Sequence, residues 1–224
     1  MDAVKKQLGV FLLERGKASI FTQSNLTGFT IQIPTDTIND MEIASEEKLS
    51  LIVRRLLESN KLAISEIIMV LSLDFTFENE FADDVSENLM EKLKAFQDIV
   101  PFENVDSKIL KQEKKWKVIC VSKDLCDGLR RAFEKMNVSV LGVTSSALLR
   151  ETFSEMSQGF NPKIVMDKVD AIKLAGFINQ EQKNSVSEQA KTSKKKGNNL
   201  SILLIVFGSL FVILLLIVYF NYLR

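Results

Sequence analysis

The side chains of this sequence best placed to do chemistry are four carboxylates: Glu14, Glu46, Glu47 and Asp74. Carboxylates on a first strand, a first helix and a fourth strand can hold two divalent cations that assist phosphodiester hydrolysis. Glu14, however, stands at the end of its predicted strand beside an arginine. Glu46 and Glu47 fit the first turn of a helix, where the helix dipole stabilises negative charge. We therefore expect no catalytic residues and no metal site.

Other catalytic constellations are missing from the sequence. It contains no histidine, which excludes histidine triads and imidazole acid–base chemistry. Ser145 and Ser146 thus lack the usual base for a serine nucleophile, and we interpret them as a helix cap. Cys120 and Cys126 match no zinc or redox spacing and are expected to be buried, reduced thiols. Because there is no glycine-rich phosphate loop either, we expect no cofactor and no enzyme activity.

The charge distribution argues against a nucleic-acid surface. The 29 Lys and Arg side chains balance 29 Asp and Glu, but residues 1–180 carry 23 basic and 27 acidic side chains, a net charge of −4. A mildly acidic domain is a poor partner for phosphate backbones. Trp116 lies among Lys114, Lys115 and Lys117, and this group is either a stacking patch or the rim of a hairpin, which we favour.

The C-terminal segment predicts a membrane anchor. Residues 200–220 contain no charge, and as a helix they would span about 32 Å, close to the ~30 Å hydrocarbon core of a bilayer. The residues that flank this span are Lys194, Lys195 and Lys196 before it, and Tyr219 and Tyr222 at its far end. The positive-inside rule then places the preceding residues in the cytoplasm. We expect a single-pass protein of the inner (plasma) membrane.

The elements that must position the candidate residues alternate along the chain. Apolar patterning predicts strands over residues 8–13, 18–22, 29–33, 67–71, 108–111, 116–121 and 138–143. Helices are expected to begin at Ser45, near Asp84 and Glu87, at Ser122 and at Ser145. Phe75 and Phe77 are expected to continue strand 67–71, and we favour a core position for both over an exposed sheet edge.

This order of elements resembles half of an actin-like, or ribonuclease-H-like, domain. The second block carries more specific phrases: Ile99-Val-Pro-Phe102 after a helix, a hairpin ending in Trp116-Lys-Val-Ile-Cys-Val121, and Val138-Ser-Val-Leu-Gly-Val-Thr-Ser-Ser-Ala147 after the next helix. These phrases resemble the PilM/GspL actin-like proteins of type IV pilus and type II secretion machines, over about residues 8–150. The resemblance implies an α/β (α+β) fold with a mixed sheet and flanking helices, to which the sequence adds one C-terminal transmembrane helix.

The sequence departs from that family where ATP would bind. Relatives that bind ATP place an Asp and a Gly/Ser-rich turn after the first strand, whereas Leu8–Gly16 has no Asp and one turn glycine. A second actin-like half has no room between Phe153 and Leu200. The resemblance therefore implies a nucleotide-free half domain.

The expected organisation has five parts: a cytoplasmic actin-like half domain (1–156), an amphipathic helix (157–178), a flexible polar, Lys-rich linker (179–199), a transmembrane helix (200–220) and a short outer tail (221–224). The expected function is a non-catalytic scaffold or adaptor of a type IV pilus-like or type II secretion-like inner-membrane platform. Its partners would be inner-membrane assembly proteins, with no nucleic acid and no small-molecule substrate, and a homodimer is left open. The alternative is a generic tail-anchored interaction module unrelated to pili or secretion.

Overall fold

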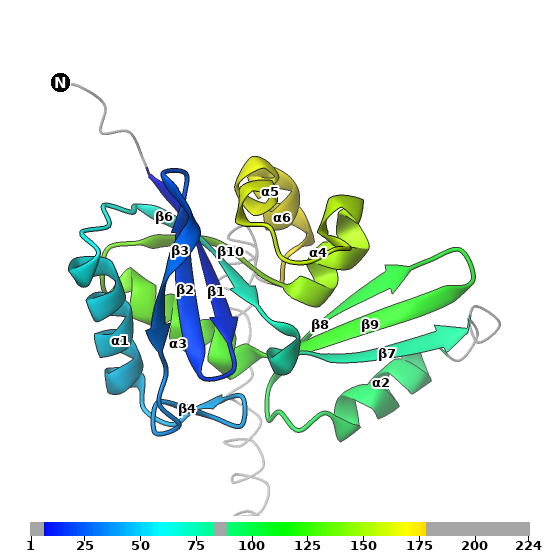
Figure 1. Cartoon of the computed structure of the whole chain (residues 1–224). Coiled ribbons are helices and arrows are strands. Elements are labelled where there is room, and N and C mark those ends of the chain that lie inside the picture. The colour runs from blue at the N-terminus through cyan, green and yellow to red at the C-terminus, as the bar shows by residue number, and fades with distance from the viewer. Residues whose placement is uncertain (1–6, 83–88, 178–224) are drawn as a thin grey trace, which may run out of the picture. The chain divides into compact units, whose positions relative to one another are not determined.

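The computed structural model describes residues 7–82 and 89–177. In this part of the chain, five strands form a mixed sheet in the order β10-β6-β1-β2-β3 (Figure 1). They are β1 (Leu8–Glu14), β2 (Lys17–Thr22), β3 (Asn25–Gln32), β6 (Glu66–Leu71) and β10 (Ser139–Ser145). The first three form an antiparallel meander, and β6 and β10 run parallel to β1. The mixed α/β sheet expected from the sequence is confirmed.

Strand β1 lies at the centre of this sheet, and both of its faces are covered. Phe11 and Leu13 face one core, whereas Val10 and Leu12 face the other. This explains why the strand is a continuous apolar run rather than an alternating one. The register pairs Phe11 with Ile20 on β2 and with Met69 on β6.

Helices α1 (Glu46–Ser59) and α3 (Lys123–Glu134) cover the face of Phe11 and Leu13. Both begin where the sequence predicts a cap. The Ser45 hydroxyl accepts a hydrogen bond from the Lys48 backbone N–H at 3.3 Å, and the Ser122 hydroxyl accepts one from that of Leu125 at 3.2 Å. Each cap satisfies a backbone donor that the first turn leaves without an intrahelical partner.

The opposite face is covered by short helical segments: α4 (Ser146–Thr152), the 3₁₀ turn η3 (Ser154–Met156), α5 (Pro162–Asp167) and α6 (Val169–Ala175). The single amphipathic helix predicted over 157–178 is therefore wrong. The chain leaves helical geometry at Lys168 (φ −107°, ψ 23°). The break allows Val165 on α5 and Ile172 on α6 to reach the same core as Val10.

A second sheet, in the order β7-β9-β8, is inserted between β6 and α3. It consists of β7 (Phe77–Ala82), β8 (Val105–Lys111) and β9 (Lys115–Ser122), and α2 (Leu89–Ile99) packs on one face. We call β7, β8, β9 and α2 the small subdomain.

The expectation that Phe75 and Phe77 continue strand 67–71 is wrong. Strand β6 ends at Leu71, and the 3₁₀ turn η1 (Leu73–Phe75) redirects the chain into the second sheet. Phe75 is buried in the main core, and Phe77 packs in the small subdomain. The expected core role of both rings is thus confirmed, in two different cores. A two-residue strand pair, β4 (Ile38–Asn39) with β5 (Glu42–Ile43), was not expected.

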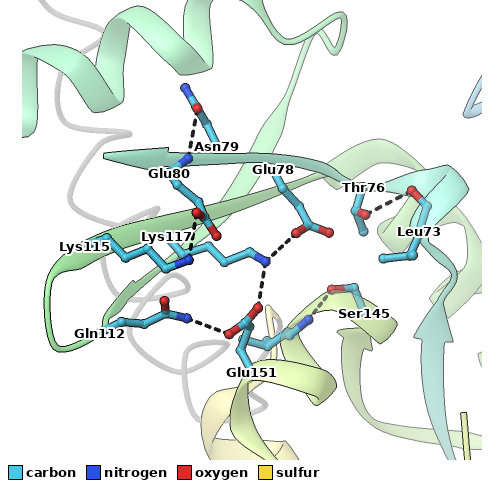
Figure 2. A network of polar contacts seen from close by, with 11 residues as sticks. Leu73, Thr76, Glu78, Asn79, Glu80, Gln112, Lys115, Lys117, Ser145 and Glu151 are labelled. Carbon is cyan, nitrogen blue, oxygen red and sulfur yellow. Dashed lines mark hydrogen bonds and ion pairs between the residues drawn. The ribbon is translucent and has the colours of Figure 1, made fainter. Parts of the chain in front are cut away.

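Polar contacts join the small subdomain to α4 (Figure 2). The Lys117 ammonium lies 2.7 Å from a carboxylate oxygen of Glu78 on the neighbouring strand and 2.7 Å from one of Glu151 on α4. Gln112, in the β8–β9 turn, donates a hydrogen bond to the other oxygen of Glu151 at 2.6 Å. Glu151 therefore binds two residues of the small subdomain at once.

Among the described residues, none of the helices combines the length and the apolar character needed to cross a bilayer. Several sequence predictions lie outside the described residues. They are the span 200–220 with its flanking residues Lys194–Lys196, Tyr219 and Tyr222, the linker 179–199, and the helix start at Asp84 and Glu87.

Candidate functional site

A cavity of about 360 Å³ opens where the parallel strands β1, β6 and β10 end. We call it the strand-end cavity. Its lining consists of Leu12, Glu14, Ser72, Leu73, Asp74, Ser146, Arg150, Met156, Gly159 and Phe160. Ligand sites of open α/β sheets lie outside the carboxyl ends of the parallel strands, and this cavity occupies that place.

Each polar side chain of the cavity is placed by the end of an element. Glu14 is the last residue of β1, directly before the two-residue turn Arg15-Gly16, in which Gly16 adopts φ 75°. Asp74 lies in η1, just after β6. Arg150 projects from α4, whose cap is Ser145: the Ser145 hydroxyl accepts a hydrogen bond from the Leu148 backbone N–H at 3.1 Å.

The charges in this cavity are only partly neutralised by the chain. Glu14 pairs with the exposed Lys17 ammonium at 3.2 Å. Asp74 accepts a hydrogen bond from the Ser72 hydroxyl at 3.2 Å. Neither Asp74 nor Arg150 forms an ion pair with another residue in the described part of the chain. The cavity therefore presents one unpaired carboxylate and one unpaired guanidinium.

The structure brings together two of the four carboxylates considered from the sequence. Glu14 and Asp74 line the same cavity. Glu46 instead pairs with Arg131 on α3, and Glu47 accepts a hydrogen bond from its own cap residue, Ser45. Within residues 7–82 and 89–177 there is no group of three metal-ligating side chains. The three-carboxylate arrangement for two-metal chemistry is therefore not assembled in this part of the chain.

The turn after β1 is also unsuited to phosphate. A phosphate cradle presents several backbone N–H donors, usually from a glycine-rich turn or a helix N-terminus. Here the link between β1 and β2 is only Arg15 and Gly16, and the side chain that lines the cavity is the Glu14 carboxylate. Its negative charge opposes a second anion at that place.

The lysines around Trp116 do not form a free basic patch. Lys117 is held between Glu78 and Glu151, and Lys115 lies 2.8 Å from a Glu80 carboxylate oxygen. The Trp116 ring carries the Lys111 ammonium 5.0 Å from its centroid. The hairpin interpretation of this cluster fits these contacts better than a stacking surface for bases does.

The two cysteines are buried and not joined to each other. Burial raises the pKa of the Cys120 thiol to about 11, and it raises the pKa of Cys126 as well. Because the thiolate is the reactive form, a raised pKa makes both thiols poorly reactive near neutral pH.

Searches of protein-family models and of curated proteins found no match. Solved structures do match. One is the PilM–PilN type IV pilus biogenesis complex, with 11% identity over 69% of this chain and 52% of that chain, and a TM-score of 0.48. Another is the cytoplasmic domain of EpsL, an inner-membrane component of the type II secretion system of Vibrio cholerae. It has 14% identity, covers 64% of this chain and 57% of that chain, and has a TM-score of 0.40.

A third match is a Bacteroides thetaiotaomicron protein of unknown function with an actin-like ATPase fold, with 15% identity, coverage of 68% of this chain and 57% of that chain, and a TM-score of 0.39. This chain is similar to PilM/GspL-like proteins of the actin-like fold. The chain spans a little over half the length of these structures, since it covers 52 to 57% of each.

Proposed function

We propose that this protein is a non-catalytic, membrane-anchored scaffold or adaptor that gathers assembly proteins of a type IV pilus-like or type II secretion-like platform. The observation that carries the proposal is the turn after β1. A fold of this kind would hold a nucleotide phosphate there, and this chain has a two-residue turn preceded by Glu14. A protein that has this sheet but lacks the phosphate cradle would act by binding other proteins and not by nucleotide chemistry.

The narrower parts of the proposal rest on the sequence. The phrases Ile99–Phe102, Trp116–Val121 and Val138–Ala147 support the assignment to a pilus-like or secretion-like platform. The charge-free segment 200–220 behind the lysines supports the anchor. A fold by itself hosts many functions, so the proposal takes its narrower parts from these sequence features and not from the fold.

We infer that a partner segment docks at β3. This strand is an edge of the main sheet and is bonded to β2 only, among the described residues. An extended peptide can add a strand to such an edge through main-chain hydrogen bonds, and side-chain pockets then give specificity. Leu26 on this strand is 44% exposed and offers an apolar contact, while the Thr27 and Gly28 backbone N–H groups beside it donate to the Asn25 side chain.

Site-specific photocrosslinking tests the proposal with the full chain in native membranes. A photoreactive residue at Leu26 is expected to crosslink to an inner-membrane assembly protein with a short cytoplasmic segment. Asp98, exposed on α2 in the small subdomain, is the matched control position and should give a weaker or different product. Crosslinks from Leu26 that reach only soluble proteins or nucleic acid would contradict the scaffold role. Crosslinks to membrane proteins of an unrelated system would favour the generic adaptor.

A further inference from the structure

We propose that the strand-end cavity binds a small zwitterion, an α-amino acid with an apolar side chain. The proposal is independent of the scaffold role, because it concerns a ligand and not the docking of a protein. The cavity volume of about 360 Å³ lies at the lower end of the roughly 300–1,000 Å³ usual for small-molecule sites. Its lining combines both signs of charge with an apolar wall, and each of these three features has a counterpart in an amino acid.

Arg150 supplies the site for the carboxylate. Its side chain is exposed, lines the cavity and has no ion pair with another described residue. A guanidinium presents planar, paired N–H donors that match the two oxygens of a carboxylate. The helix that carries Arg150 is fixed at both ends, by the Ser145 cap and by the contacts of Glu151 with Lys117 and Gln112. The guanidinium is thus carried by a rigid element, which limits the entropy cost of binding.

Asp74 supplies the site for the ammonium. It lines the same cavity from η1, on the sheet side, and only the Ser72 hydroxyl binds its carboxylate among the described side chains. Glu14, next to it in the lining, is already paired with Lys17. Asp74 is therefore the carboxylate left free to accept hydrogen bonds from a ligand ammonium, and Glu14 adds negative charge nearby.

The remaining lining forms an apolar wall from Leu12, Leu73, Met156 and Phe160. Leu73 is 45% exposed at the rim, although it is a large aliphatic side chain. Phe160 is fixed against Phe21, with ring centroids 5.5 Å apart. A ligand side chain that covered Leu73 would remove apolar surface from water, which is the usual source of affinity in such pockets.

The same lining disfavours other ligand classes. A polyphosphate would face Glu14 and Asp74, and Arg150 is the only cationic side chain among the described residues that line the cavity. A divalent cation would have two carboxylates at most and a guanidinium beside them. A simple fatty acid would leave Asp74 without a cationic partner, since only Glu14 is paired, with Lys17. Only a ligand that carries both charges matches both sides of the cavity.

Isothermal titration of the purified full chain in mild detergent tests this inference. The probes are L-leucine, 4-methylpentanoate, which lacks the ammonium, and 3-methylbutylamine, which lacks the carboxylate. We expect saturable binding of L-leucine, with each analogue weaker by about tenfold or more, because each loses one charge-assisted contact. Arg150→Met and Asp74→Asn should each weaken the binding of L-leucine by about tenfold or more.

The matched controls are Arg54→Met and Asp98→Asn, which replace exposed residues outside the cavity lining and should leave binding unchanged. Thermal unfolding of every variant checks that the fold is intact. Any one of three results would overturn the inference: no saturation by L-leucine up to about 10 mM, equal affinity for L-leucine and its two analogues, or unchanged L-leucine binding in Arg150→Met. Displacement of bound L-leucine by Mg-ATP at micromolar concentration would also overturn it, in favour of a nucleotide site.

Discussion

At the scale of single residues, Lys117 connects the small subdomain to α4 through its ion pair with Glu151. Its side chain is only 12% exposed and touches the carboxylates of Glu78 and Glu151 (Figure 2). Burial lowers the pKa of Lys117, but the hydrogen bonds that it donates to Glu151 and Glu78 outweigh burial, and its pKa is raised. The raised pKa means that the ion pairs stabilise the fold below the ordinary lysine pKa, and that this contribution is lost as the pH rises through the folded-state value.

Replacing Lys117 by Met should lower the free energy of unfolding by about 2 kcal/mol, because two partly buried carboxylates lose their shared cation. Denaturant unfolding of the full chain at neutral pH measures this loss. The control is Lys115→Met, which removes an exposed pair with Glu80 and should cost under about 1 kcal/mol. Equal losses in the two variants would show that Lys117 is not a special contact.

Asp106 on β8 gives a prediction of pH dependence. Burial raises the pKa of its carboxyl above the ordinary value of 3.8, against the attraction of Lys123 and Arg130. The folded state then binds its proton more tightly, so the ionised group destabilises the fold above pH 3.8 and not below it. Asp106→Asn should therefore stabilise the protein at pH 7, by up to about 1 kcal/mol, and lose this advantage in acid. An equal stabilisation by Asp106→Asn at pH 7 and in acid would contradict the raised pKa of Asp106.

At the scale of elements, the packing of α6 on β10 depends on a glycine. A Cβ built on Gly176 would lie 2.6 Å from the Val143 carbonyl oxygen, and the Phe177 backbone N–H donates to that same oxygen at 2.8 Å. The backbone at Gly176 (φ −64°, ψ 166°) is open to any residue, so the requirement is one of space alone. The close approach lets the chain after α6 bond to the edge of the main sheet.

Gly176→Ala should destabilise the protein by about 2 kcal/mol, because either the Val143 carbonyl or the chain after α6 must move. Gly142→Ala is the matched control, since a Cβ there would meet its nearest atom at 3.7 Å, an ordinary contact. Thermal or denaturant unfolding compares the two variants. A Gly176→Ala protein as stable as the Gly142→Ala protein would show that the approach of the two elements is not as close as described.

Local patterns in the sequence were enough to predict the caps and the central strands. Ser45, Ser122 and Ser145 each accept the hydrogen bond expected of a cap, since capping depends only on residues three positions apart. The course of the chain after Leu71 was not predictable in this way. Whether Phe77 continues β6 or begins another sheet is decided by its pairing with Cys120, far along the chain.

The strand-end cavity was predictable only in part. Glu14 ends β1 and Asp74 follows β6, and these two strands lie side by side, so the proximity of the two residues could be anticipated from the topology. The sequence did not predict Arg150 in the cavity lining, because its position depends on the direction in which α4 leaves β10. The break between α5 and α6 at Lys168 was also not predictable from the sequence, since the apolar periodicity on its two sides is nearly continuous.

At the scale of the whole molecule, the described domain precedes a predicted anchor in the sequence. The described residues build a main sheet with a core on each face and a smaller three-stranded sheet with a core of its own (Figure 1). Polar contacts join the small subdomain to α4 (Figure 2). The sequence places a charge-free span beyond them. Such an arrangement suits a protein that acts by holding partners near a bilayer, because tethering raises their effective concentration.

Fractionation of cells that express the full chain tests the anchor. The protein is expected in the membrane fraction, resistant to high salt and alkaline carbonate and released by detergent, because about 20 apolar residues bind a bilayer far more strongly than surface charges do. A peripheral membrane protein of the same cells, which high salt releases, serves as the control. Recovery of the chain in the cytosolic fraction without detergent would show that residues 200–220 do not anchor it.

We propose that this protein has an actin-like sheet without nucleotide chemistry, and equilibrium titration of the full chain with Mg-ATP tests this proposal. The short turn after β1 and the carboxylates of Glu14 and Asp74 predict no saturable binding at millimolar concentration. A saturable site with a micromolar Kd, about −8 kcal/mol, would contradict the claim.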